Sequence, residues 1–191
     1  ISAPKKCDRS RENGFTLIEL LMTLVISTTI LLLAIPLYQN VKISIQKEIV
    51  TLQLAQDLKL AKNLAGIEER YITLCGTTDG QSCVDAKQYE WPAWMMFYDD
   101  ERTFIPDENT LIHYYESQNL APYHLFIQTT RNIGGGINMS PRAEYAYGMA
   151  RSIANGRINL CDKRDRPQTY YPSMVINVYG YSRADREQGT C

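Results

Sequence analysis

A carboxylate inside an apolar run is the residue of this sequence with the strongest chemical consequence. Glu19 is the only charged side chain of the stretch Phe15–Leu37, which is otherwise rich in leucine, isoleucine and valine. An unpaired charge in such surroundings costs roughly 3 kcal/mol or more, so Glu19 needs a cationic partner, or acts as a switch that finds one after assembly. The alternative is a position near a membrane interface, where the carboxylate reaches the headgroups.

The cysteines favour disulfides over a metal site. The five cysteines are Cys7, Cys75, Cys83, Cys161 and Cys191. No two of them form a CxxC pair, and the two histidines are far from any cysteine in sequence, so zinc is not expected. In an exported chain four of them make two bridges. Cys75 and Cys83 close a short loop and are expected to pair, which leaves Cys161 with Cys191, although four cysteines permit three connectivities.

Sequence motifs of catalysis are missing. The chain has no Gly-x-Ser-x-Gly, no His-Glu-x-x-His and no glycine-rich phosphate loop ending in lysine, since Gly134–Gly136 reads as a turn. His113 and His124 lie in apolar stretches and are interpreted as packed or surface side chains. The acidic segment Asp99–Glu101 with Asp107 and Glu108 matches no calcium loop and reads as solvated. We therefore predict no enzyme, no cofactor and no metal.

Charge is balanced overall but not along the chain. The sequence has 20 Lys and Arg against 21 Asp and Glu, which by itself predicts no nucleic-acid partner. Phe15–Pro141 contains 8 basic and 14 acidic residues, whereas Arg142–Cys191 contains 8 basic and 5 acidic residues. The last quarter is thus the basic end of an acidic protein.

The apolar run around Glu19 predicts a membrane anchor. Roughly 20 apolar residues cross a bilayer as a helix, and Phe15–Leu37 reaches that length. The basic flank Ile1–Gly14 would stay cytoplasmic, which places the rest of the chain outside. No small-residue cleavage site follows Leu37, so we expect the anchor to remain.

Helical periodicity continues beyond the anchor. Apolar residues recur at helical spacing and predict an amphipathic helix under a globular head; they are Val41, Ile45, Ile49, Leu52, Ala55 and Leu58. We expect the whole helix to span Phe15–Ala65, about 75 Å at ~1.5 Å per residue, with Gly66 just after its end. Pro36 should kink the helix or melt it locally.

From Arg70 onward the pattern changes to short β-rich runs between turn residues. The predicted strands are Tyr71–Cys75, Trp94–Tyr98, Leu111–Tyr115, His124–Gln128, Ala143–Tyr147, Ile158–Cys161 and Met174–Val178. Many short strands after one long helix indicate an α+β fold, with the long N-terminal helix followed by an antiparallel β-sandwich-like globular head.

The segment Gly14-Phe-Thr-Leu-Ile-Glu-Leu-Leu21 resembles the prepilin signature of type IV pilins and pseudopilins. The resemblance implies that prepilin peptidase cuts between Gly14 and Phe15 and that Phe15 becomes N-methylated. It also implies that Glu19 pairs with the terminal amine of a neighbouring subunit and that Pro36 is the kinking proline of the family. The implied parts are a leader (1–14), a membrane or filament-core helix (15–38), an amphipathic half (39–66) and a periplasmic head (67–191). Removal of the leader also removes Cys7.

Within the head, the chain resembles the GspH/FimT branch of minor pilins and pseudopilins, including FimU-like proteins. The residues are Leu74-Cys75, Cys83, the run Trp91–Asp100, and the later runs Gly156–Cys161 and Met174–Gly180. The resemblance implies a minor type IV pilin that helps to initiate or cap a pilus, anchored in the inner membrane before it joins other pilins. The alternative is the GspH-type pseudopilin of a type II secretion system.

The basic tail suggests a third hypothesis, DNA binding during natural transformation. Some FimT-type minor pilins bind DNA through Gly-Arg-x-Arg, and Gly180-Tyr-Ser-Arg183 matches that motif except that Tyr181 replaces its first arginine. The implied patch contains Arg183, Arg186, Lys163, Arg164 and Arg166, with Tyr181 available for stacking. Interleaved acidic residues favour instead a neutralised, solvated surface.

Overall fold

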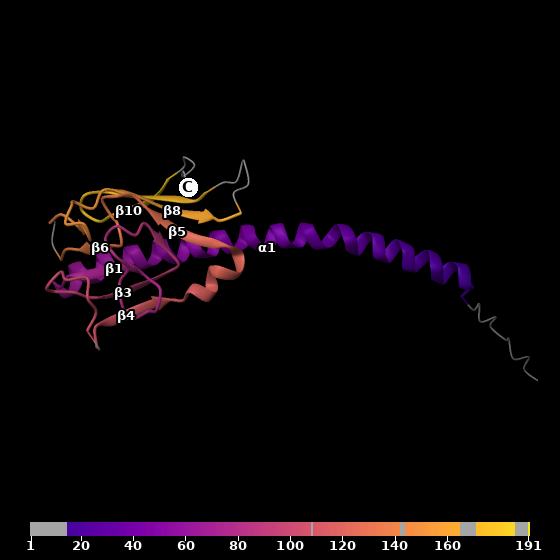
Figure 1. Ribbon diagram of the computed structural model, residues 1–191, viewed down its shortest axis with the longest axis horizontal. Helices are drawn as coiled ribbons and strands as arrows, with labels where there is room; N and C mark the ends of the chain where they lie inside the picture. Colours follow the sequence, from indigo (N-terminus) through magenta and orange to yellow (C-terminus); the bar gives the residue numbers. More distant parts are fainter. Residues whose placement is uncertain (1–14, 108, 142–143, 165–170, 186–190) are drawn as a thin grey trace, which may run out of the picture. The chain divides into compact units, whose positions relative to one another are not determined.

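The computed structural model describes residues 15–107, 109–141, 144–164, 171–185 and 191, except for the side chains of residues 36 and 117. The chain divides into two compact units, Ile1–Lys42 and Ile43–Cys191. Helix α1 (Leu17–Glu68) contributes to both (Figure 1). The second unit, which we call the head, contains the C-terminal part of α1 and all of the strands.

The helix ends later than its sequence predicts. Gly66 lies inside α1, so the prediction that it follows the helix end is wrong. Glu69 follows the last helical residue and has a φ of 53°, in the left-handed region that typically stops a helix. Helical structure is continuous through residue 36, so the locally melted turn considered for Pro36 is absent. A kink at Pro36 stays a prediction.

The head contains two antiparallel sheets, which confirms the predicted α+β fold class. The strands are β1 (Ile72–Thr77), β2 (Glu90–Trp91), β3 (Ala93–Tyr98), β4 (Leu111–Tyr115), β5 (Leu125–Thr129), β6 (Gly136–Met139), β7 (Tyr147–Gly148), β8 (Gly156–Asp162), β9 (Ser173–Ile176) and β10 (Ser182–Asp185). The first sheet has the order β4-β3-β1-β6-β7, and the second has the order β10-β9-β8-β5-β2. Two short 3₁₀ turns, Ser117–Asn119 and Ala121–Tyr123, join β4 to β5.

Most strands lie where alternation and β-propensity placed them, and β4 has the predicted bounds. Strand β6 was missed because it begins at Gly136, the last of three glycines that read as a turn. The short strands β2 and β10 carry no extended apolar run and were also missed. The prediction of a strand over Ala143–Tyr147 is wrong, because of its described residues, 144–147, only the last lies in a strand, β7.

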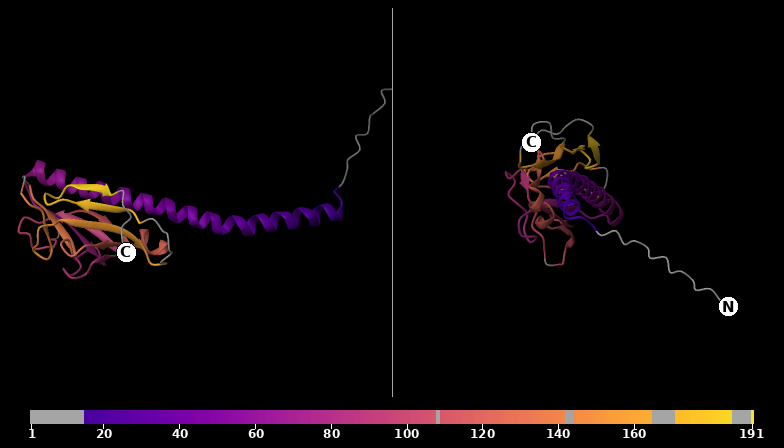
Figure 2. Two further views of the ribbon diagram at one scale, coloured as in Figure 1. Left: turned by 90° about the horizontal axis from the view of Figure 1, so that it is seen from above. Right: turned by 90° about the vertical axis from the view of Figure 1, so that its right-hand side faces the viewer.

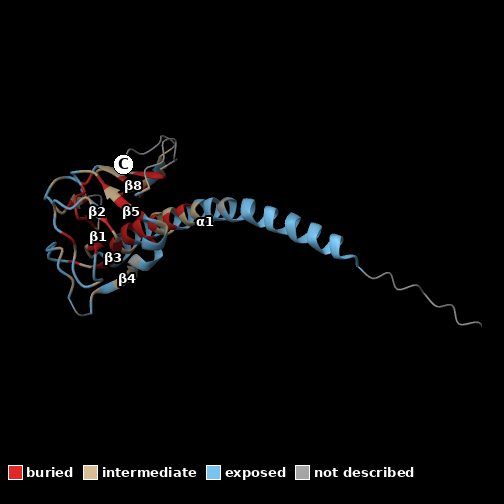
Figure 3. Ribbon diagram, turned by 45° about the vertical axis from the view of Figure 1, so that its right-hand side comes forward, coloured by how far each residue is buried: buried red, intermediate tan, exposed pale blue. Residues whose placement is uncertain are grey.

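One face of the C-terminal part of α1 forms the core with the inner faces of both sheets. The helix contributes Val50, Leu54, Leu58, Ala61 and Ala65 to a cluster that includes Leu74 and Trp94 of the first sheet and Ile127 and Leu160 of the second. Figure 2 shows the strands gathered along one side of this part of α1, and Figure 3 shows its buried positions among them. Burial of apolar surface stabilises the fold by roughly 25 cal/mol per Å². This apolar face is therefore the main contact that holds α1 against the two sheets.

The opposite face of the helix is also apolar, which corrects the sequence interpretation. Of the six residues expected to pack under the head, only Leu58 is buried, and Ala55 is half-buried against the core. The remaining residues, Val41, Ile45, Ile49 and Leu52, are 50–55% exposed. Because two apolar stripes run along opposite faces of this helix, spacing alone could not decide which one meets the head.

Candidate assembly site

The first turn of α1 is closed by reciprocal hydrogen bonds between Thr16 and Glu19. The Glu19 backbone N–H donates to Thr16 Oγ1 at 3.3 Å, and the Thr16 backbone N–H donates to Glu19 Oε2 at 3.4 Å. Thr16 directly precedes the helix, and Glu19 is its third residue. This is the arrangement of a capping box, which satisfies two of the N–H groups that a helix start leaves unpaired. Glu19 is thereby oriented toward the helix start.

The side chains that follow Phe15 present an apolar surface. Residues 15–35 are exposed at every position, with Leu32 and Leu33 at 71% and 75%. A window of this helix has a mean hydropathy of 2.4 and no residue buried within the chain. By length and composition the segment can cross a membrane, and so large an exposed apolar surface requires lipid or partner helices to cover it.

The polar hydroxyls of this segment are satisfied within the helix. Thr23, Ser27, Thr28 and Thr29 each donate to a backbone carbonyl three or four residues earlier. Such bonds let hydroxyl side chains enter an apolar environment at little cost. Glu19 therefore remains the one side chain between Phe15 and Val41 that brings a full charge into that environment.

Residues 9–35 match the model of the prokaryotic N-terminal methylation motif. The match covers the Gly14–Phe15 junction, Thr16, Glu19 and most of the apolar segment. It supports a type IV pilin-like protein. Neither the curated proteins nor the solved structures gave a match to the chain.

The residues at the start of the helix of this pilin-like protein are exposed. Phe15 is 80% exposed and directly precedes the capping residue. The Glu19 carboxylate, which Thr16 holds at the helix start, is exposed as well. Gly14, on the other side of the predicted cleavage point, lies outside the described residues.

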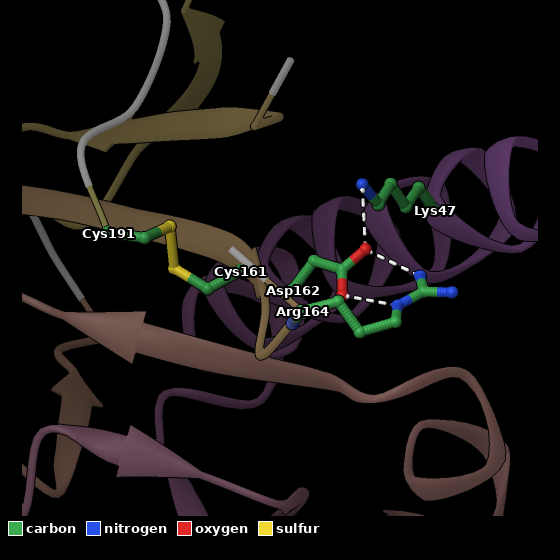
Figure 4. Close-up of polar contacts among 5 residues, drawn as sticks. All are labelled: Lys47, Cys161, Asp162, Arg164 and Cys191. Carbon is green, nitrogen blue, oxygen red and sulfur yellow. Dashed lines mark hydrogen bonds and ion pairs between the residues drawn. A yellow bond between two sulfur atoms is a disulfide. The ribbon is translucent and has the colours of Figure 1, made fainter. Parts of the chain in front are cut away.

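Within the head of the pilin-like protein, a buried ion cluster joins α1 to the end of β8. Lys47 Nζ lies 3.3 Å from Asp162 Oδ2, and Arg164 binds both oxygens of Asp162 at 2.6 and 2.8 Å (Figure 4). Burial disfavours the ionised carboxylate, but the hydrogen bonds from Arg164 and the charge of Lys47 outweigh it and lower the pKa of Asp162 to about 2. The neighbouring Cys161–Cys191 disulfide ties the last residue to the same strand.

The ion cluster predicts a loss of stability in acid. The folded pKa of Asp162 lies below its usual 3.8, so its contribution is complete above about pH 4 and is lost as the pH falls toward 2. The expected loss is about 2 kcal/mol in the free energy of unfolding. Urea unfolding of the 43–191 fragment across this pH range should show it, and Asp162→Asn should flatten the dependence. An unchanged pH profile in that variant would contradict the assigned role of Asp162.

A second buried charge of α1, Asp57, contacts the first sheet. Its Oδ2 accepts a 2.7 Å hydrogen bond from Trp94 Nε1, and its Oδ1 accepts one from Gln53 at 3.1 Å. His113 Nδ1 lies 3.2 Å from the same Oδ2, at ion-pair distance but without hydrogen-bond geometry. Trp94 also stacks on Tyr115, with ring centroids 3.9 Å apart. Asp57 thus holds the Trp94 indole in the core and contacts His113 of the neighbouring edge strand, β4.

The third buried charge of α1 is Lys62. Its Nζ donates to the Ser140 carbonyl at 3.0 Å and lies 5.4 Å from the centre of the Tyr181 ring. Burial lowers the pKa of the Lys62 ammonium. Together with Lys47 and Asp57, this residue is expected to fix the register between α1 and the sheets, because ion pairs and hydrogen bonds are more directional than apolar contacts.

The second disulfide joins Cys75 of β1 to Cys83, with their Cα atoms 5.6 Å apart. Cys75 packs with Met95 and Phe97 on the outer face of the first sheet, so the bridge holds the loop after β1 over a small second cluster. Both disulfides have the partners that the spacing of the cysteines favoured. In the described part of the chain, no group of three His, Cys, Asp or Glu side chains could hold a metal.

The residues of the predicted DNA-binding patch lie at different ends of the second sheet. Arg183 of β10 and Arg157 of β8 both lie opposite Val175 of β9, so they are at the same level of the sheet. Lys163 comes six residues after Arg157, which is about 20 Å further along the strand direction. Arg164 is held by Asp162. Arg183 and Tyr181 are exposed, the latter at 60%. Arg166 and Arg186 lie outside the described residues, and DNA binding stays a prediction.

Sequence reasoning missed Thr16 and the three buried charges of α1. The signal for Thr16 was present, because threonine followed three residues later by glutamate before an apolar run is the sequence form of a capping box. Lys47, Asp57 and Lys62 gave no such signal. Charged residues on a helix normally face water, and only the position of their partners in β3, in β8 and after β6 buries them.

Proposed function

We propose that this protein is a minor type IV pilin that helps to initiate or cap a pilus. The observation that carries the proposal is the methylation motif placed at the start of an exposed apolar helix, with one carboxylate in its first turn. In this proposal residues 1–14 are a leader, residues 15–38 lie in the inner membrane and later in the filament core, and residues 39–66 carry the periplasmic head.

The proposed chemistry of assembly is charge neutralisation. Cleavage after Gly14 frees the Phe15 amine, a cation at the end of an apolar helix. Each subunit then brings one cation and one carboxylate, Glu19, into surroundings of low dielectric constant. Docking of two helices pairs the amine of one with the carboxylate of the other, and it is favourable mainly because the unpaired charges are so poorly solvated.

The outward stripe of α1 supports packing among sister helices. Ile45, Ile49, Leu52 and Leu60 are 43–55% exposed on the side of α1 that faces away from the core. An apolar stripe continuing beyond the membrane segment has no use in a freely solvated head, whereas it can be covered by the helices of neighbouring subunits.

The cleavage point gives a direct test of the proposal. Purified from cells that contain prepilin peptidase, the mature chain is expected to begin at a methylated Phe15, as read by mass spectrometry. Gly14→Leu should retain the leader, because a bulky side chain next to the scissile bond obstructs close approach of the peptidase, whereas Asn13→Ala should be processed normally. A wild-type chain that keeps its leader would rule out the proposed maturation.

Deletion of the gene separates the pilin from the pseudopilin. A minor pilin predicts loss of surface pili and twitching with secreted enzymes unchanged. An export defect with normal pili would instead assign the protein to a type II secretion system.

A further inference from the structure

The two sheets of the head end in four edge strands, and one of them differs from the rest. Strands β2 and β7 have only two residues each, and β10 carries two charged side chains, Arg183 and Asp185. Short length and charge are the usual protections of a sheet edge against pairing with another chain. The fourth edge, β4, has five residues with the sequence Leu-Ile-His-Tyr-Tyr and lacks these two protections. Its one irregularity is a register shift against β3 at Ile112, which has no residue paired opposite it.

The outer side of β4 has unused hydrogen-bonding groups. The strand pairs with β3 along one side, regularly over His113–Tyr115 and with a register shift between His113 and Leu111. Among the described residues no other backbone group bonds to Leu111–Tyr115. Half of the N–H and C=O groups of an edge strand point away from its only neighbour, so β4 offers a row of donors and acceptors to an added strand. Figure 1 shows β4 at the border of the head.

The side chains of β4 suit an uncharged partner strand. Leu111 is 50% exposed, and the following four residues are half-buried. Ile112 and Tyr115 already pack against the core, which holds the strand in an extended form. An added strand therefore meets a preformed, apolar edge and does not have to order β4 on binding.

Acidic side chains stand at both ends of this edge. Asp107 precedes β4 and Glu116 directly follows it; both are exposed, and neither forms an ion pair with a described residue. Asp107 also lines a hollow of about 340 Å³, in which four carboxylates, those of Asp99, Asp100, Glu101 and Asp107, outnumber the one cation, Arg70. Two exposed carboxylates at the ends of a strand without Asp, Glu, Lys or Arg favour a partner with basic flanks.

The same charges disfavour a second copy of this chain as the partner. Antiparallel pairing of two β4 strands about His113 would place Glu116 of each copy opposite Thr110 of the other, near Asp107. Like charges brought together in this way oppose self-association.

We propose that β4 is a docking edge for β-strand addition, and that its partner is an extended protein segment with an uncharged centre and lysine or arginine at both ends. Main-chain hydrogen bonds along Leu111–Tyr115 supply the affinity, and Asp107 and Glu116 select the basic flanks. The inference is independent of the proposed role in a pilus, because it uses only contacts within the head.

The test is hydrogen exchange on the full-length protein in detergent micelles. The probe is a capped synthetic peptide of alternating valine and threonine with lysines at both ends, long enough to reach from Asp107 to Glu116. Saturating peptide is expected to slow exchange of the outward β4 amides by about tenfold or more. A peptide with glutamate ends should bind at least about tenfold more weakly, and one N-methylated at alternate valines should leave β4 exchange unchanged.

A matched pair of variants controls for added charge. Leu111→Lys places a cation on the edge and should abolish the slowing, whereas Ile153→Lys, at a 39% exposed position beside β7 on the opposite edge of the same sheet, should retain it. Unchanged β4 exchange with the lysine-ended peptide, or equal slowing by its N-methylated form, would overturn strand addition. Equal binding of the glutamate-ended peptide would overturn the assigned partner charge. Concentration-dependent protection of β4 without peptide, together with dimers in sedimentation, would identify a second copy and also overturn the proposal.

Discussion

Replacing Glu19 by alanine is expected to lower incorporation of the protein into filaments at least about tenfold, since an unpaired terminal amine in an apolar core costs several kcal/mol. The change removes the carboxylate proposed to neutralise the Phe15 amine of a neighbouring subunit. Immunoblots of sheared filaments and of the membrane fraction measure it, because the variant should accumulate in the membrane. Glu48→Ala, which removes an exposed carboxylate further along the same helix, should assemble normally.

The capping box requires a further control. Glu19→Ala also breaks the reciprocal bonds with Thr16, and loss of a helix cap costs about 1 kcal/mol. Thr16→Val removes the cap and leaves the carboxylate, so it should assemble far better than Glu19→Ala. Glu19→Gln keeps a hydrogen-bond acceptor without the charge and should fail like alanine. Normal incorporation of the glutamine variant would refute charge neutralisation and leave capping as the role of Glu19.

Replacing Asp57 by alanine is expected to lower the free energy of unfolding of the head by about 3–5 kcal/mol. The residue is 3% exposed, and its carboxylate accepts the Trp94 indole N–H at 2.7 Å. Alanine would leave this buried donor unsatisfied, remove the charge facing His113 and open a cavity between α1 and the first sheet. Urea unfolding of the 43–191 fragment is a suitable measurement, because that unit contains the whole hydrophobic core.

Two substitutions separate the hydrogen bond from general effects on the helix. Asp57→Asn retains an oxygen acceptor for Trp94 and should lose clearly less stability than alanine. Glu48→Ala on the exposed side should stay within about 0.5 kcal/mol of the parent. An alanine variant at position 57 that unfolds like the parent would show that Asp57 does not fix the register between helix and sheets.

The sequence predicted some elements of this fold and failed to predict others. The apolar segment after Phe15, the change from helical to β-rich pattern near Arg70 and the bounds of β4 all follow from local composition and periodicity. The lone charge at Glu19 was equally visible, because its significance depends on neighbours within a few residues. Strand β6 and the helix end at Glu68 were not predicted from the sequence. Glycine at positions 66 and 136 indicated a break in regular structure, but packing in the folded head keeps both residues within a helix or strand.

By itself, then, the sequence determined the long apolar helix, its single carboxylate, the β-rich head and two bridges among four cysteines. Only the tertiary structure decided which face of α1 the head covers. It also decided that Lys47, Asp57 and Lys62 are buried, and that β4 is left open between two acidic ends. The reason is physical: helix formation and hydrophobic patterning depend on near neighbours along the chain. Burial of a charge and exposure of a strand edge depend on residues that meet only when the sheets close around the helix.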